Sequence, residues 1–91
     1  IANVAQAAGL SCHIGSNLEL GIGTAAMLQV AATSPCIQSE TYPADLIGPL
    51  YHEADLLKNP LQLGPIAAKI PEGPGLGVEL DEKQLEQWRV D

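Results

Sequence analysis

The sequence predicts an α/β fold, and three observations point to it. The segment Ser11–Gly15 is short and mostly small or apolar, as expected of a buried strand. A polar turn that carries Glu19 follows, and residues 20–33 then place apolar side chains at helical steps of three and four. Strand, turn and helix in this order form a βα unit, and α/β folds hold ligand-binding groups at the carboxyl ends of such strands.

The first third of the chain is expected to contain three elements. Residues 1–8 have helical apolar spacing and are followed by Gly9, which suits the end of a helix. No N-cap precedes them, so we interpret them as the last turns of a longer helix. The strand at 11–15 comes next. The helix over 20–33 should end before Pro35, because the residue before a proline avoids helical geometry.

The rest of the chain is expected to be largely irregular. Its elements are a polar loop, a turn or extended segment, an edge hairpin, an extended piece and a final helix, at residues 36–49, 50–58, 61–70, 78–80 and 82–88. The hairpin strands, 61–63 and 66–70, flank Gly64–Pro65. Asp81 should cap the final helix, whose first turn carries further acids.

Charge divides the chain into two parts. The 91 residues carry a formal net charge of -7. Glu19 is the single charged residue of positions 1–35, and every other charged residue lies in 36–91. A domain of this size must expose much of its surface, and the first part has little suited to water. We therefore expect residues 1–35 to be covered by protein outside this sequence.

Composition excludes several partners. Four basic residues, one Trp and two Tyr give no basic stripe and little aromatic surface for binding nucleic acid. The apolar stretch at 20–33 contains glycines and is shorter than the roughly 20 residues of a membrane span. Cys12 and Cys36 belong to no metal-ligand spacing and are expected to be free thiols of a cytoplasmic protein.

Four motifs carry a family resemblance. They are Ala-Gly-Leu-Ser-Cys-His, Ser-Asn-Leu-Glu, Gly-Ile-Gly-Thr-Ala-Ala and Pro-Gly-Leu-Gly-Val-Glu-Leu-Asp-Glu-Lys-Gln-Leu, at residues 8–13, 16–19, 21–26 and 74–85. In this order and spacing the sequence resembles the carboxy-terminal end of the enolase superfamily, specifically the muconate-lactonizing and mandelate racemase-like enzymes. The resemblance covers nearly the whole chain.

The resemblance implies a fold. It identifies the chain as a C-terminal fragment of a (β/α)₇β TIM-like barrel followed by a tail. Residues 1–8 would end helix 7, residues 11–15 would form strand 8, and residues 20–33 would form helix 8. On this basis residues 1–35 are the last βα unit of the barrel domain. Residues 36–91 complete an α+β capping domain, which the amino-terminal part of such enzymes mainly forms.

The resemblance also implies an activity. Such enzymes abstract a proton α to a carboxylate and hold the enediolate on Mg²⁺. The metal ligands and the catalytic bases lie on earlier strands, so this chain alone should be inactive and Lys58, Lys69 and Lys83 are not candidates. Muconate cycloisomerase is the most similar type. An acid-sugar dehydratase or an amino-acid-derivative epimerase of the same superfamily is the first alternative, and a self-sufficient, non-enzymatic oligomerising module is the second.

Glu19 is the candidate catalytic residue. It matches the glutamate at the end of the family's eighth strand, which lies near the carboxylate substrate. The alternative role is a charge that stabilises the amino terminus of the next helix. We expect burial to raise the pKa of Glu19, so that a protonated side chain could donate a hydrogen bond.

His13 and Ser16 are the candidate substrate-binding residues by the same resemblance. Gly15 stands where many relatives carry a second histidine, which leaves the substrate open. A structural histidine is the alternative for His13. Ser16 and Asn17 also suit helix caps.

Two other patterns favour structural roles. The glycines at 21 and 23 lack the lysine of a phosphate-binding loop and should instead let the helix approach the barrel closely. A metal site that combines both cysteines with both histidines lacks any recognised spacing, so no metal ligand is expected in this chain.

The uncharged helices and the bare strand edge of residues 1–33 predict a homo-oligomer.

Overall fold

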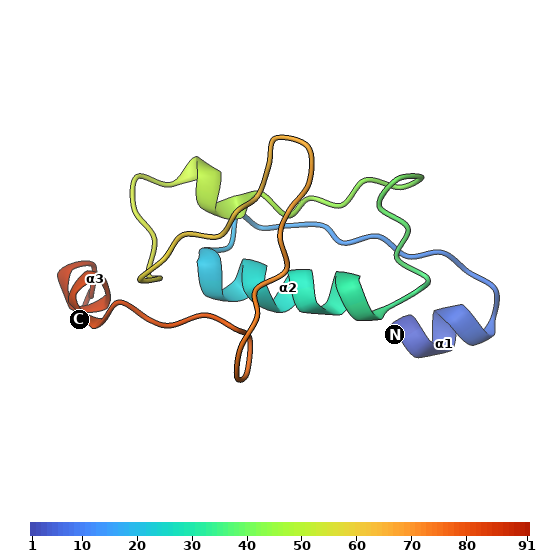
Figure 1. The fold of residues 1–91 in the computed structure, drawn as a ribbon, viewed down its shortest axis with the longest axis horizontal. Coiled ribbons are helices and arrows are strands. Elements are labelled where there is room, and N and C mark those ends of the chain that lie inside the picture. The colour runs from blue at the N-terminus through green and yellow to red at the C-terminus, as the bar shows by residue number, and fades with distance from the viewer.

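A computed structural model describes residues 1–91, which form an elongated, mainly irregular structure of 45 × 27 × 25 Å. Its helices are α1 (Ala2–Ala7), α2 (Gly21–Thr33), the 3₁₀ helix η1 (Gly48–Tyr51) and α3 (Glu82–Gln87). α1 and α3 lie at opposite ends of the molecule with α2 between them (Figure 1). The radius of gyration of 14.4 Å exceeds the roughly 12 Å of a compact domain of this length, which reflects this extended arrangement.

The predicted helices are confirmed. α1 ends where Gly9 adopts a positive φ of 73°, and α2 ends before Ser34, which is extended as expected of a residue that precedes proline. Asp81 caps α3, since its side chain accepts hydrogen bonds from the backbone amides of Lys83 and Gln84. A cap of this kind satisfies amides that the helix itself leaves unpaired.

The strand predicted at 11–15 was wrong in this structure. Only Cys12 pairs, in a single parallel bridge with Ile37. The backbone amide of Cys12 donates to Cys36 O at 2.9 Å, and Ile14 O next accepts from Asp45 N at 2.9 Å. Because the partner segment loops out between these two contacts, no continuous ladder forms and the side chains of 11–15 are exposed or half-buried rather than buried.

The hairpin predicted at 61–70 was also wrong. One backbone hydrogen bond joins its two arms, from Lys69 N to Gln62 O at 2.8 Å. Pro60, Pro65 and Pro71 remove backbone donors along the segment, which prevents a ladder.

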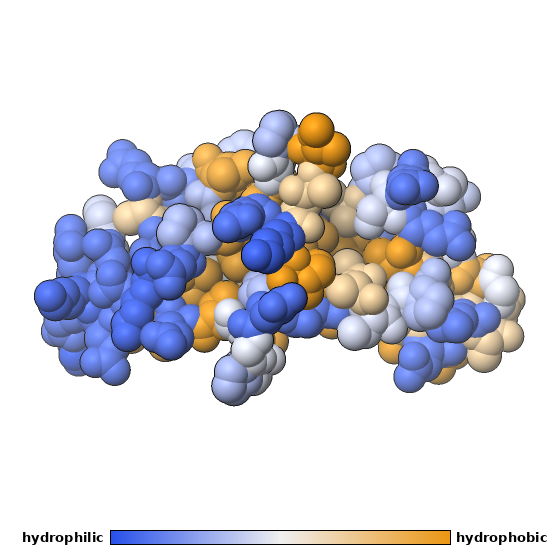
Figure 2. Space-filling model, in the orientation of Figure 1, coloured by the Kyte–Doolittle hydropathy of each residue, from blue (hydrophilic) through white to orange (hydrophobic).

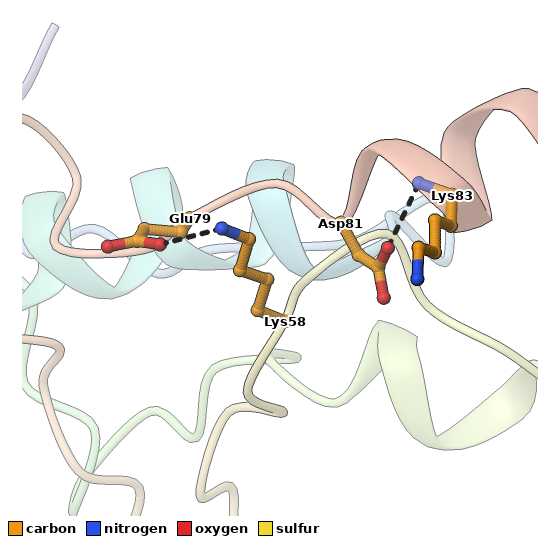
Figure 3. Close-up of polar contacts among 4 residues, drawn as sticks. All are labelled: Lys58, Glu79, Asp81 and Lys83. Atoms are coloured by element: carbon orange, nitrogen blue, oxygen red, sulfur yellow. Dashed lines mark hydrogen bonds and ion pairs between the residues drawn. The ribbon is translucent and has the colours of Figure 1, made fainter.

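The extended piece at 78–80 pairs with residues 56–58. Leu80 forms an isolated antiparallel bridge with Leu57. Alongside it, Lys58 Nζ lies 3.2 Å from Glu79 Oε2, and Asp81 Oδ1 accepts from Lys83 N at 3.0 Å (Figure 3). Both partners of the ion pair are exposed, so it adds little stability. Backbone pairing through Leu57 and Leu80 is what joins this part of the tail to the core.

The core is small and centres on α2. Its buried side chains are Thr24, Ala25 and Leu28 of α2 with Cys36 and Leu57 of the tail. α2 also packs against η1. Figure 2 shows hydrophilic residues gathered at the α3 end, with apolar surface left exposed across the middle of the molecule. An apolar groove of about 620 Å³ lies between α2 and the loops that contain residues 39–47 and 63–70.

Candidate functional site

The turn that carries Glu19 lies directly before α2 and holds both oxygens of the carboxylate. Ser16 Oγ donates a short hydrogen bond to Glu19 Oε2, and Asn17 N donates to Glu19 Oε1 at 2.9 Å. Ser16 Oγ also accepts from Leu18 N at 2.8 Å. The Ser16 hydroxyl is therefore a junction between the backbone of the turn and the carboxylate of Glu19.

These hydrogen bonds set the ionisation of Glu19. They lower its pKa from the ordinary value of 4.5, the hydrogen bond from Ser16 having the largest effect and that from the Asn17 amide the next. Partial burial acts in the opposite direction but is the weaker influence. The expected rise in pKa was wrong, because the turn supplies two donors to a side chain that is only half-buried. Glu19 is an anionic hydrogen-bond acceptor at neutral pH.

Leu18 adopts a backbone conformation that leucine rarely takes. Its φ is 63°, the one positive φ outside glycine in the structure. A residue other than glycine in this region costs on the order of 1–3 kcal/mol and persists only where its surroundings hold it. The geometry of the Glu19 turn therefore depends on contacts from outside the turn.

Two of those contacts come from the tail. The Leu18 carbonyl lies 2.7 Å from His52 Nε2. A carbonyl only accepts, so this ring nitrogen must be the donor. Gly48 lies against the next residue, where an added Cβ would come within 2.3 Å of Glu19 O and 2.8 Å of Glu19 N. The link of His52 to Leu18 had no signal in the sequence.

A third contact from the tail caps α2. The helix begins after Leu20, whose side chain makes no cap hydrogen bond. Asp55 takes this role, since its Oδ1 accepts from Gly21 N at 2.8 Å and from Leu56 N at 2.7 Å. Asp55 Oδ2 is buried with no hydrogen-bond partner. The only hint of the Asp55 cap in the sequence is indirect: Leu20, which precedes α2, has no side-chain group that could cap the helix.

The glycines at the start of α2 permit close packing, but their neighbours in this structure are not the predicted barrel. A Cβ on Gly21 would lie 2.4 Å from Asp55 Oδ2 and 2.5 Å from Leu57 Cδ1, and one on Gly23 would lie 2.9 Å from Glu19 Cβ. Within this chain the close neighbours are thus the 55–57 segment and the Glu19 turn.

The two candidate substrate-binding residues lie in different environments. Ser16 is half-buried and bonded to Glu19, whereas His13 is exposed and makes no side-chain hydrogen bond. Neither Ser16 nor Asn17 caps α2, because Leu20 occupies that position. Ser16 instead shapes the turn that presents the carboxylate.

Cys12 and Cys36 are free thiols, as predicted. Burial raises the pKa of Cys36, and the neighbouring Cys12 thiol raises it further.

No group of three or more His, Cys, Asp or Glu side chains is placed to hold a metal ion. No helix combines the length and the apolar character that crossing a membrane would require.

Comparisons with known proteins agree on a single family. The profile of the enolase C-terminal domain-like family matches residues 1–84. A chloromuconate cycloisomerase of Cupriavidus pinatubonensis is 43% identical over 88 residues, 97% of this chain and 23% of that protein. Muconate cycloisomerase 1 of Rhodococcus opacus is 40% identical over 85 residues, 93% of this chain and 22% of that protein.

The backbone is similar to that of a solved relative. The crystal structure of a muconate lactonizing enzyme from Klebsiella pneumoniae superposes with a TM-score of 0.86 at 38% identity, over 99% of this chain and 24% of that one. The chain thus spans about a quarter of the length of the relatives that it matches.

Proposed function

Because this chain belongs to the enolase C-terminal domain-like family, we propose that it is the carboxy-terminal part of an enolase-superfamily enzyme of the muconate cycloisomerase type. In this proposal residues 1–35 are the last βα unit of the barrel, in which residues 11–15 would pair with strands outside this sequence, and residues 36–91 complete the capping domain. The observation that carries it is the Glu19 carboxylate, held by two donors on the loop before α2, in a chain similar to two cycloisomerases and a lactonizing enzyme.

Glu19 is the residue to which we assign a catalytic role. The substrate would be a small carboxylate from which a proton α to the carboxylate is removed, or to which one is returned. A second carboxylate beside Glu19 would raise its pKa by repulsion between like charges. Glu19 would then take up a proton and donate a hydrogen bond to the substrate. Ser16 and His13 are proposed to bind the substrate, with Ser16 also orienting Glu19.

A Mg²⁺ ion belongs to the proposed full-length enzyme. The residues of this chain do not fit it, because Mg²⁺ prefers several oxygen ligands in octahedral array and no cluster of carboxylates is present here. Both oxygens of Glu19 already accept hydrogen bonds from the turn. The ligands and the base are therefore assigned to the rest of the protein.

Exposed apolar surface supports the proposed partners. The chain exposes 6640 Å², whereas a self-contained domain of this mass exposes roughly 5,000 Å². Its exposed apolar side chains include Ile1, Val4 and Leu10. We assign this surface to contacts with the rest of the enzyme and with a second copy in a homo-oligomer. The free thiols are typical of the cytoplasm, the location that we propose.

The proposal is tested with the Glu19→Gln variant of the full-length protein, assayed with muconate and chloromuconate. Glutamine keeps the shape of the side chain, but its amide cannot ionise and donates a weaker hydrogen bond than a carboxylic acid, so kcat should fall about tenfold or more. Stability to denaturant should change little. Glu53→Gln is the control, because Glu53 is exposed and its side chain makes no hydrogen bond.

Two outcomes would contradict the proposal. Activity of Glu19→Gln within about twofold of the wild type would leave Glu19 as a charge at the start of a helix. Turnover of an acid-sugar or an amino-acid derivative by the wild-type protein, with no turnover of muconates, would replace the cycloisomerase by the dehydratase or epimerase alternative.

A further inference from the structure

Three consecutive peptide units around Glu19 are held by three residues of the tail, Gly48, His52 and Asp55. In the Leu18–Glu19 unit, the carbonyl accepts from His52 Nε2 at 2.7 Å. In the Glu19–Leu20 unit, the carbonyl lies against Gly48, with room for no Cβ there. In the Leu20–Gly21 unit, the amide donates to Asp55 Oδ1 at 2.8 Å. One segment of the chain thus fixes every peptide plane from Leu18 to Gly21.

His52 acts on the backbone that leads into Glu19. A peptide unit is planar, so holding the Leu18 carbonyl also fixes the direction of the Glu19 N–H and Cα. Leu18 has a positive φ of 63°, which leucine does not keep without support. His52 is exposed and outside the Ser16–Glu19 hydrogen bonds. It therefore reaches the carboxylate only through the backbone.

We propose that His52 is a positioning residue, and that Gly48, His52 and Asp55 act as a clamp that holds Leu18 in its left-handed conformation and thereby presents the Glu19 carboxylate. The inference rests on the proposed function for its meaning in catalysis. The donor at Nε2 is present in both the neutral and the protonated ring, so the clamp does not depend on the charge of His52.

The first experiment compares His52→Leu, His52→Gln and Tyr51→Leu in the full-length protein. His52→Leu removes the donor, and we expect kcat to fall about tenfold while KM changes less than about twofold, because the carboxylate is misplaced rather than lost. His52→Gln offers a side-chain N–H at similar reach and should restore most of the turnover. Tyr51→Leu is the matched control, since Tyr51 is the exposed neighbour and makes no side-chain hydrogen bond.

The second experiment needs no turnover. The pKa of the Glu19 carboxyl is measured by NMR titration of protein labelled with ¹³C at glutamate. Ser16 and Asn17 hold this pKa below its ordinary value, so loosening the turn in His52→Leu should move it upward, toward 4.5. Tyr51→Leu should leave it unchanged. If the wild type does not convert muconates, the proposed function fails, whereas this titration still decides whether the clamp exists.

The overturning results are equally specific. An unchanged Glu19 pKa in a folded His52→Leu variant would show that the turn holds its shape without His52. An equal loss of kcat in Tyr51→Leu would show that the variants act through general packing of the tail. Failure of His52→Gln to restore both kcat and the Glu19 pKa would show that the hydrogen bond to Leu18 is not the cause.

Discussion

Residues 1–35 and residues 36–91 differ in almost every local property. The first part contains the short helix α1, the 13-residue helix α2 and a single charged side chain, while the second contains two short helices and all other charged residues. The core nevertheless draws on both, since Leu28 of the first part is 2% exposed and Leu57 of the second is 6% exposed. An irregular segment can therefore be as firmly built into a structure as a helix.

Each of the two parts makes a different set of contacts at the Glu19 turn. The first part supplies the carboxylate and the donors Ser16 and Asn17, which set its ionisation. The second part supplies the contacts that fix the backbone beneath it. Gln29 of α2 in turn binds the tail, since its Nε2 donates to the carbonyls of Pro71 at 2.9 Å and Leu76 at 3.3 Å. Regular structure and positional precision come from different parts of the chain.

The largest expected effect tests whether the tail belongs to the core. Leu57→Ala should destabilise the full-length protein by about 2–5 kcal/mol, as should Leu28→Ala, because each removes a buried side chain and leaves a cavity. Denaturant unfolding of both variants measures this. A loss below about 1 kcal/mol for Leu57→Ala alone would show that the tail only rests on α2.

A smaller effect concerns the cap that the tail gives to α2. Asp55→Ala should cost about 1 kcal/mol, the usual value for removing a helix cap. Asp55→Asn keeps an acceptor for Gly21 N and should cost less. Asp45→Ala is the control, because the Asp45 side chain is exposed and makes no hydrogen bond. Equal stability of Asp55→Ala and Asp45→Ala, compared by thermal unfolding, would show that Asp55 does not stabilise α2 as a cap.

The smallest effect is the pH dependence that Glu19 contributes. Its pKa is lower in the folded state than the ordinary 4.5, so the unfolded state binds the proton more tightly. The stabilisation is complete above about pH 4.5 and is lost as the pH falls through the lower folded pKa. The stability difference between the wild type and Glu19→Gln should therefore shrink below pH 4.5. A constant difference for Glu19→Gln across this pH range would contradict the lowered pKa.

Local signals predicted the helices well. The apolar spacing of α2, the proline that follows it and the Asp81 cap of α3 all act within a few residues, so the sequence alone places them. The strand at 11–15 and the hairpin at 61–70 were wrong because pairing depends on a partner segment, and the only bridge at Cys12 is to Ile37. A strand pattern shows that a segment can pair but does not show that a partner runs alongside it.

The candidate site was predictable only in part. Glu19 stood out as the lone charge of the first 35 residues and by its place in the family motif. Its lowered pKa was missed because it arises from the turn geometry, which brings Ser16 and Asn17 onto both oxygens. His52 and Asp55 were missed because each acts on a backbone group far away in the sequence, and a backbone group has no residue type to identify it.

The distance along the chain of these contacts has a consequence for how the protein matures. His52 and Asp55 each lie 34 residues beyond the group that they bind. During synthesis neither the left-handed backbone of Leu18 nor the first amide of α2 has its partner until the ribosome has released the tail. Closing loops of this length precedes any gain from the contacts, which places them late in folding. Transient detachment of the tail would therefore remove the support of Leu18 and the cap of α2 together.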